Sequence, residues 1–171
     1  MTQQVAIFGA GCFWGVEWVF RQVPGVIEAV SGYSGGIVAD PTYDMVCSHT
    51  TGHAEVVEVT FDPEQVTFEQ LLEVFWAMHD PTQMNRQGPD VGDQYRSAIF
   101  TRSSEQQEAA EASKKRAQER FSRPIATEIR PAGPFYPAED FHQRWYERKG
   151  HEPYCHVLPV GVLKELGLVR A

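Results

Sequence analysis

Apolar and polar residues along the chain predict two successive strand–helix–strand units. Residues 5–8 form a short apolar run, too short for a helix, and predict a buried strand. A stripe of apolar residues at helical spacing follows, beginning with Phe13 and ending with Phe20. After the turn at Pro24-Gly25, residues 26–30 predict a second strand.

The strand predicted for residues 54–61 opens the second unit and carries a glutamate on its apolar face. Successive side chains of a strand point to opposite faces, so Glu55 shares one face with three apolar residues, Val57, Val59 and Phe61. Glu58 lies on the other, more polar face. Burial raises the pKa of a carboxyl group, so an inward Glu55 would be able to donate a proton near neutral pH. The alternation leaves open whether Glu55, near the start of the strand, instead reaches solvent at the sheet end.

Further elements follow, separated by two long polar loops. Thr67 and Gln70 form a predicted capping box for a helix whose buried stripe runs to Met78. The remaining predicted elements are a strand at 95–101, a helix from a Ser104/Gln107 capping box toward Phe121, a strand at 125–130 and a helix at 138–148. The loops cover residues 31–52 and 81–94, and loops of this length are usually functional.

The element order predicts an α+β fold. The first six elements fit a ferredoxin-like split βαβ sandwich, in which helices cover one face of a mixed sheet. Extra helices follow, and residues 149–171, with weak periodicity, predict an irregular C-terminal tail. We expect one domain spanning residues 1–171, although the pattern does not determine the order of the strands.

Composition and charge narrow the class of protein. The formal net charge of −8 argues against a nucleic-acid surface, which needs a basic face. Three cysteines are too few for a disulfide framework and favour a reducing compartment. The chain starts without the basic segment of a signal peptide, and no apolar stretch has membrane-spanning length. We therefore expect a cytoplasmic protein with no nucleic-acid or membrane partner.

Cys12 lies where the first predicted strand passes into the first predicted helix, after the turn Gly9-Ala10-Gly11. The unpaired N–H groups and the dipole of a helix N-terminus favour an anion, so this thiol should ionise more readily than that of a free cysteine. Phe13 and Trp14 beside it offer an apolar wall for a small apolar substrate group. This position favours a nucleophile over a buried structural cysteine.

Other arrangements of the same residues have weaker support. A dinucleotide-binding motif would need a glycine one place before Gly15. A zinc site could draw on Cys47, His49, His53 and the Cys155-His156 pair, but none of these has the paired spacing of a zinc motif. Cys12, His53 and Glu55 could form a cysteine-hydrolase set, which spacing does not exclude. A non-catalytic, aromatic-rich binding module with an inert Cys12 also stays open.

The motif around Cys12 resembles a known enzyme family. Gly11-Cys12-Phe13-Trp14-Gly15 matches the GCFWG signature of the A-type peptide methionine sulfoxide reductases. Further similar segments are Gly32–Gly36, Pro41–Tyr43, Gly52–Glu55, His79–Pro81, Arg86–Gly88, Asp93–Ser97, Pro134–Tyr136, Ala138-Glu139 and His142-Gln143. The resemblance runs in the same order to about Trp145, so it is far more specific than a single motif.

This resemblance implies reduction of methionine S-sulfoxide, free or in proteins, to methionine. Cys12 would be the nucleophile and Glu55 the acid. The other implied site residues are Tyr43 and Tyr95 for the sulfoxide oxygen, Phe13 and Trp14 for the methyl pocket, and Asp90 for a polar part of the substrate. Pro89 stands beside Asp90 where the resemblance leads us to expect an asparagine.

The tail differs more from the family pattern. Many members carry one or two recycling cysteines in a Gly-rich C-terminal segment, whereas residues 152–156 hold one cysteine and little glycine. The resemblance implies Cys155 as the resolving thiol, which would form a disulfide with Cys12, and thioredoxin as the reductant. It implies no cofactor or metal. Cys47, in the loop predicted for residues 31–52, is the rival resolving thiol.

Overall fold

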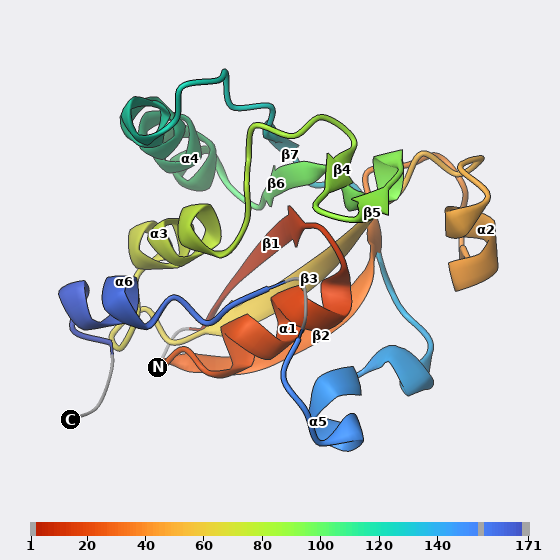
Figure 1. Ribbon diagram of the computed structural model, residues 1–171, viewed down its shortest axis with the longest axis horizontal. Coiled ribbons are helices and arrows are strands. Elements are labelled where there is room, and N and C mark those ends of the chain that lie inside the picture. The colour runs from red at the N-terminus through yellow and green to blue at the C-terminus, as the bar shows by residue number, and fades with distance from the viewer. Residues whose placement is uncertain (1–2, 154–155, 169–171) are drawn as a thin grey trace.

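The computed structural model describes residues 3–153 and 156–168, which build an α+β fold around a mixed sheet (Figure 1). The sheet has the strand order β7-β6-β1-β3-β2-β8. Its strands are β1 (Gln4–Ala10), β2 (Val26–Ser34), β3 (Ala54–Phe61), β6 (Ser97–Thr101), β7 (Glu128–Pro131) and β8 (Phe135–Pro137). The β6–β7 pair is parallel and the other pairs are antiparallel. A separate short hairpin joins β4 (Arg86–Gln87) to β5 (Asp90–Val91).

Helices cover mainly one face of this sheet. They are α1 (Phe13–Arg21), α2 (Tyr43–Cys47), α3 (Phe68–Met78), α4 (Ser104–Ala117), α5 (Trp145–Lys149) and α6 (Val160–Glu165). Short 3-10 helices span Asp93–Tyr95, Gln118–Arg120 and Asp140–His142. Apolar side chains of α1, α3, α4 and α6 form the main core with the sheet, and a smaller cluster around Phe100 fills the opposite face. No helix in the described part of the chain is long and apolar enough to cross a membrane.

The register of the antiparallel strands brings segments that are distant in sequence to one end of the central strands, which we call the sheet edge. Phe8 of β1 pairs with Val57 of β3, so the end of β1 and the start of β3 lie together. At the same edge, Tyr33 of β2 pairs with Glu55, and Ala10 pairs with Ser97. Cys12 follows β1 directly, and residues 93–95 precede β6. The register therefore brings together the ends of the strands that lead to or carry Cys12, Glu55 and Tyr95.

Several local predictions are confirmed. The capping box of α3 is present, with the Thr67 hydroxyl accepting from the Gln70 backbone N–H and the Gln70 side chain accepting from that of Thr67. The strand at 54–61 has the predicted bounds. The helix expected from a Ser104/Gln107 box begins one residue earlier, because the Ser103 hydroxyl accepts from the Gln106 backbone N–H.

Other local predictions are wrong. Residues 31–52 are not one loop, since β2 continues to Ser34 and α2 lies within the segment. The single helix predicted for 138–148 is interrupted, because Arg144 adopts a left-handed conformation between the 3-10 turn and α5. The tail is not irregular throughout: α6 forms there and buries Leu163 in the main core.

Candidate active site

Cys12 caps the N-terminus of α1, as the sequence predicts. Its backbone carbonyl accepts from the N–H groups of Gly15 and Val16, at 3.2 and 3.3 Å, which starts the helix. Gly11, with a φ of 98°, makes the turn from β1 that an L side chain would strain. As the N-cap residue, Cys12 lies at the positive end of a nine-residue helix. Only 8% of Cys12 is exposed, so little water reaches it.

Glu55 points inward, next to the Cys12 turn, and this settles the alternative of a solvent-facing carboxyl. It is 1% exposed, and one carboxyl oxygen, Oε1, accepts from the backbone N–H of Phe13 at 3.1 Å. The other oxygen, Oε2, is buried without a hydrogen-bond partner among residues 3–153 and 156–168. Burial, followed by the nearby Cys12 sulfur, raises the pKa of Glu55 well above its ordinary value. The protonated acid therefore predominates over a wider pH range than in a free glutamate.

Tyr43 and Tyr95 both lie close enough to Glu55 to interact with it electrostatically. Tyr43 begins α2 and Tyr95 ends the 3-10 turn before β6. Burial, and then the charge of Glu55, raises the pKa of both hydroxyls. Both therefore keep their protons at neutral pH and can donate hydrogen bonds beside the Glu55 carboxyl.

Asp90 belongs to the same cluster. It lies on β5, close enough to Glu55 and Tyr95 for its charge to raise the pKa of both groups. Its Oδ2 is buried and has no hydrogen-bond partner within the described chain. Burial raises the pKa of Asp90, with nearby His156 opposing that effect. Asp90 is thus an acceptor left available at the cluster, despite the proline before it.

Aromatic side chains form a wall beside Cys12. Phe13 is fully buried, with its ring centroid 5.6 Å from that of Tyr33. Trp14 stacks on Trp145 at a centroid distance of 4.1 Å, and its indole N–H donates to Nδ1 of His142 at 2.9 Å. These contacts fix the indole, which has two rotatable side-chain bonds, in one orientation.

Sequence reasoning missed the residues that hold this wall and Tyr43 in place. The Glu139 carboxylate accepts from the Tyr33 hydroxyl at 2.9 Å and from the Tyr43 backbone N–H at 3.0 Å, so it ties α2 to the core. His142, besides binding Trp14, packs against Tyr43 at a ring-centroid distance of 4.5 Å. The partners are about a hundred residues apart in the chain, so no local spacing could have revealed these contacts.

Of the two candidate resolving cysteines, the structure describes Cys47 and not Cys155. Cys47 ends α2 as a half-buried thiol that hydrogen-bonds with the side chains of Tyr43 and Gln94. Burial raises its pKa, which lowers the fraction of reactive thiolate at neutral pH. Cys155 lies outside the described residues. Its neighbour His156 is buried against the end of β1, with Nε2 donating to the Ala10 carbonyl at 2.7 Å.

His53 is engaged in structure rather than aimed at Cys12. Its Nδ1 accepts from the Gly36 backbone N–H at 2.9 Å, so Nε2 carries the proton and donates to the Val38 carbonyl at 2.6 Å. Both ring nitrogens are thereby used to hold residues 36–38. The hydrolase arrangement, which needs His53 as the base for Cys12, loses its geometric basis.

The zinc alternative draws no support from the described residues, and Cys155, which belongs to its ligand set, lies outside them. His49 pairs with Asp93 at 3.2 Å, Cys47 bonds to Tyr43 and Gln94, and both nitrogens of His53 have backbone partners. Among the residues that the structure describes, no group of three or more potential ligands could hold a metal ion.

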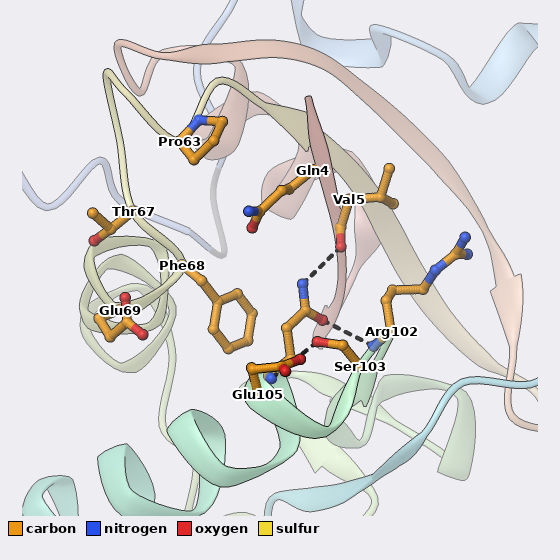
Figure 2. Close-up of a pocket in the computed structure, with 10 residues that line it drawn as sticks. Gln4, Val5, Pro63, Thr67, Phe68, Glu69, Arg102, Ser103 and Glu105 are labelled. Atoms are coloured by element: carbon orange, nitrogen blue, oxygen red, sulfur yellow. Dashed lines mark hydrogen bonds between the residues drawn. The ribbon is translucent and has the colours of Figure 1, made fainter. Parts of the chain in front are cut away.

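A large cavity lies far from Cys12. Its volume is about 680 Å³, and Figure 2 shows Gln4, Phe68 and Arg102 at its wall. β1 begins at Gln4 and ends at Ala10, and a strand of this length separates its ends by about 20 Å. The helix N-termini that border the cavity are already capped by Thr67 and Ser103. It is therefore separate from the cluster around Glu55.

Comparison with known proteins gives a consistent result. The sequence profile described as "Peptide methionine sulfoxide reductase" matches residues 4–166. The peptide methionine sulfoxide reductase MsrA of Geobacter sulfurreducens is 59% identical over 147 residues, which are 85% of this chain and 91% of that protein. The MsrA of Acidobacterium capsulatum is 56% identical over 154 residues, 89% of this chain and 98% of that protein.

Solved structures agree with the sequence matches. Mxr1 from Saccharomyces cerevisiae in reduced form superimposes with a TM-score of 0.87 at 32% identity, covering 91% of this chain and 92% of Mxr1. Mxr1 in complex with Trx2 gives a TM-score of 0.63 at 26% identity, covering 91% of this chain and 89% of that one. Sequence and fold thus lead to one conclusion: the chain belongs to the peptide methionine sulfoxide reductase family.

Proposed function

We propose that this chain is a thiol-dependent oxidoreductase that reduces methionine S-sulfoxide, free or in proteins, to methionine. One observation carries the proposal: the Glu55 carboxyl lies buried beside Cys12, with one oxygen bound to the Phe13 N–H and the other without a partner in the described chain. A nucleophile next to an available proton donor is what reduction of a sulfoxide requires.

In the first step the Cys12 thiolate attacks the sulfoxide sulfur. Glu55 donates a proton to the sulfoxide oxygen, which is otherwise a poor leaving group. The Phe13 backbone N–H donates a hydrogen bond to Oε1 of Glu55, so Oε2 is the oxygen that carries this proton. The S–O bond of the sulfoxide then breaks, the protonated oxygen ends as a hydroxyl on the Cys12 sulfur, and methionine leaves, so that Cys12 becomes a sulfenic acid.

Neighbouring side chains bind the substrate. The Tyr43 and Tyr95 hydroxyls, kept protonated by burial, donate to the oxygen as charge develops on it. Phe13 and Trp14 supply the apolar wall for the S-methyl group. Asp90 accepts a hydrogen bond from a polar part of the substrate. This role is supported by its Oδ2 atom, which is buried and has no hydrogen-bond partner within the described chain.

The sulfenic acid is recycled by thiols. Cys155 attacks the Cys12 sulfur to form a disulfide and release water, and an external dithiol then reduces the disulfide. Thioredoxin is that reductant, which the structure of the related Mxr1 in complex with Trx2 supports.

A direct assay tests this proposal. Methionine sulfoxide of each epimer, with dithiothreitol as the reductant, should yield methionine from the S epimer. A protein that consumes no sulfoxide under these conditions would contradict the proposal. Hydrolysis of an amide substrate without reductant would indicate a cysteine hydrolase instead.

His53→Ala separates the two chemistries further. Because both ring nitrogens bind backbone groups of residues 36–38, the substitution should lower stability but leave the specific activity of folded protein within a few-fold of wild type. Specific activity should be compared with the amount of folded protein measured by circular dichroism. A folded variant without activity would assign His53 a chemical role and would support the cysteine-hydrolase alternative.

The resolving thiol is identified by its disulfide. With sulfoxide and no reductant, the wild type should stop with Cys12 joined to Cys155, as seen by peptide mapping. Cys155→Ser should still release one methionine per chain and then be poorly recycled by thioredoxin. Cys47→Ser is the matched control and should behave as wild type. Mapping that joins Cys12 to Cys47 would reverse the assignment but not the chemistry at Cys12.

Three broader assignments accompany this function. We propose a ferredoxin-like split βαβ core, supported by the antiparallel order β6-β1-β3-β2 with α1 and α3 as the connecting helices. We assign residues 1–171 to one catalytic domain, with 149–171 as the tail that carries the resolving cysteine. The low cysteine count supports a reducing, cytoplasmic location.

A further inference from the structure

A second buried carboxylate lies on α1, five residues after Cys12, and the proposed reaction does not use it. Glu17 is 1% exposed, and its Oε1 accepts from the Ser31 hydroxyl at 2.7 Å. Its Oε2 accepts from Nε of Arg21 at 2.7 Å and from the backbone N–H of Arg144 at 3.0 Å. A buried charge is tolerated only where it is paired and hydrogen-bonded, so these bonds hold Glu17 and its partners firmly together.

The bond to Arg144 stabilises an unusual backbone conformation. Arg144 has a φ of 55° and a ψ of 39°, in the left-handed region, which an L residue enters only at a cost in free energy. It stands between the 3-10 turn Asp140–His142 and α5, so its conformation sets the direction in which α5 starts. The neighbouring Gln143 side chain bonds the backbone N–H and carbonyl of Ser31, at 3.0 and 2.9 Å. The start of α5 is therefore tied to both α1 and β2.

The two residues that hold the Trp14 indole flank Arg144 in the chain. Trp145, the first residue of α5, stacks on Trp14 at a centroid distance of 4.1 Å and an interplanar angle of 7°. His142 accepts from the indole N–H of Trp14 at 2.9 Å. A cavity of about 250 Å³ borders this stack and is lined by both indoles and by Glu17 and Arg144. Because this space leaves the indoles room to move, their position depends on Arg144 being held.

We propose that Glu17 is a positioning residue of the active site: by holding Arg144 it keeps the Trp14 wall in place, and it thereby sets the size of the S-alkyl group that the site accepts. The inference deepens the proposed function and rests on it. A wall held in one orientation leaves room for a methyl group and excludes a larger one. A wall that can shift toward the adjoining cavity accepts the larger group and binds the methyl group less well.

Glu17→Leu in the full-length chain tests this inference, because leucine fills the space and offers no acceptor to Arg144. The reduced protein should be given the S epimer of methionine sulfoxide, or of its ethyl homologue, in single turnovers over a range of concentrations. The wild type should prefer the methyl substrate by about 10–200-fold, the usual value of one methylene in a fitted pocket. Glu17→Leu should lower this preference about fivefold or more. It should also weaken binding of the methyl substrate, while the limiting rate stays near wild type because Cys12 and Glu55 are unchanged.

Further variants separate the bond to Arg144 from a general loss of structure. Glu17→Gln keeps an oxygen that can accept from the Arg144 N–H and should restore most of the preference. Trp145→Ala removes the next link, and combining it with Glu17→Leu should lower the preference no further than either change alone. Glu28→Gln is the matched control, because it removes the other carboxylate that pairs with Arg21, at 2.8 Å, without a contact to Arg144. It should behave as wild type.

The outcomes distinguish this inference from the function on which it rests. Wild-type preference in folded Glu17→Leu overturns the inference and leaves the function standing, as does a wild type that reduces both sulfoxides equally well. An equal fall in rate for both substrates would assign Glu17 to the chemistry or the fold, which also overturns it. If Glu17→Leu does not fold, Glu17→Asp decides: it keeps the charge one methylene short of Arg144, and a preference that stays at the wild-type value overturns the inference. If the wild type reduces neither sulfoxide, the proposed function itself fails.

Discussion

Cys12→Ser is expected to reduce methionine release to the uncatalysed background. A serine hydroxyl is hardly ionised at neutral pH and is a far weaker nucleophile toward sulfur than a thiolate. The N-terminus of α1, which favours an anion on residue 12, cannot compensate for that difference. The measurement is methionine formed from the S-sulfoxide in one turnover, before any recycling is needed.

The control for this variant is another cysteine in the same region. Cys47 lies at the end of α2 and takes no part in the proposed attack on the sulfoxide, so Cys47→Ser should release methionine at close to the wild-type rate. Circular dichroism should show that both variants fold. Substantial methionine release by Cys12→Ser would refute the entire mechanism.

Glu55→Gln is expected to lower the rate of methionine release by about 10²–10⁴-fold, the usual contribution of a general acid. The glutamine amide keeps the size of the side chain and can still accept from the Phe13 N–H through its oxygen. It cannot transfer a proton to the sulfoxide oxygen. The loss should therefore appear in the single-turnover rate rather than in folding, which thermal unfolding can check.

Glu58→Gln is the matched control, because Glu58 is on the same strand but on its opposite, partly exposed face. It should change the rate less than about twofold, as expected for a surface substitution away from the site. Equal losses in the two variants would show that the Glu55 effect is not specific to the buried face.

The pH dependence offers a second readout of Glu55. Burial and the Cys12 sulfur raise the pKa of this carboxyl, so the proton it donates is present below the raised pKa and lost as pH rises through it. Methionine release by wild type should therefore decline on the alkaline side. Glu55→Gln should lack that decline, because the amide does not titrate. A decline that persists unchanged in the variant would have to come from another group.

Strand alternation in the sequence predicted which residues of β3 share a face with Glu55, but it left open whether that carboxyl is buried, as the structure shows it to be. It places Glu55 with Val57 and Val59, and both valines belong to the main core. Helix starts were also readable, because capping depends on residues three positions apart, as at Thr67 and Gln70. The helix predicted for 138–148 failed, since the Glu17 carboxylate accepts from the Arg144 N–H and a left-handed residue interrupts the helix. Such a contact, 127 residues apart, leaves no local signal.

The sequence by itself determined the chemistry available to this protein: a cysteine at a helix start, a glutamate on an apolar strand face and aromatic neighbours. These follow from residue type and short spacing, which act within one element. Tertiary structure decided which groups meet. In the folded chain, both ring nitrogens of His53 bind backbone groups, and Oε2 of Glu55 has no hydrogen-bond partner among the described residues. The His156 ring packs against Gly15. The physical reason is that antiparallel pairing and tail docking join residues far apart in the chain, where local pattern carries no information.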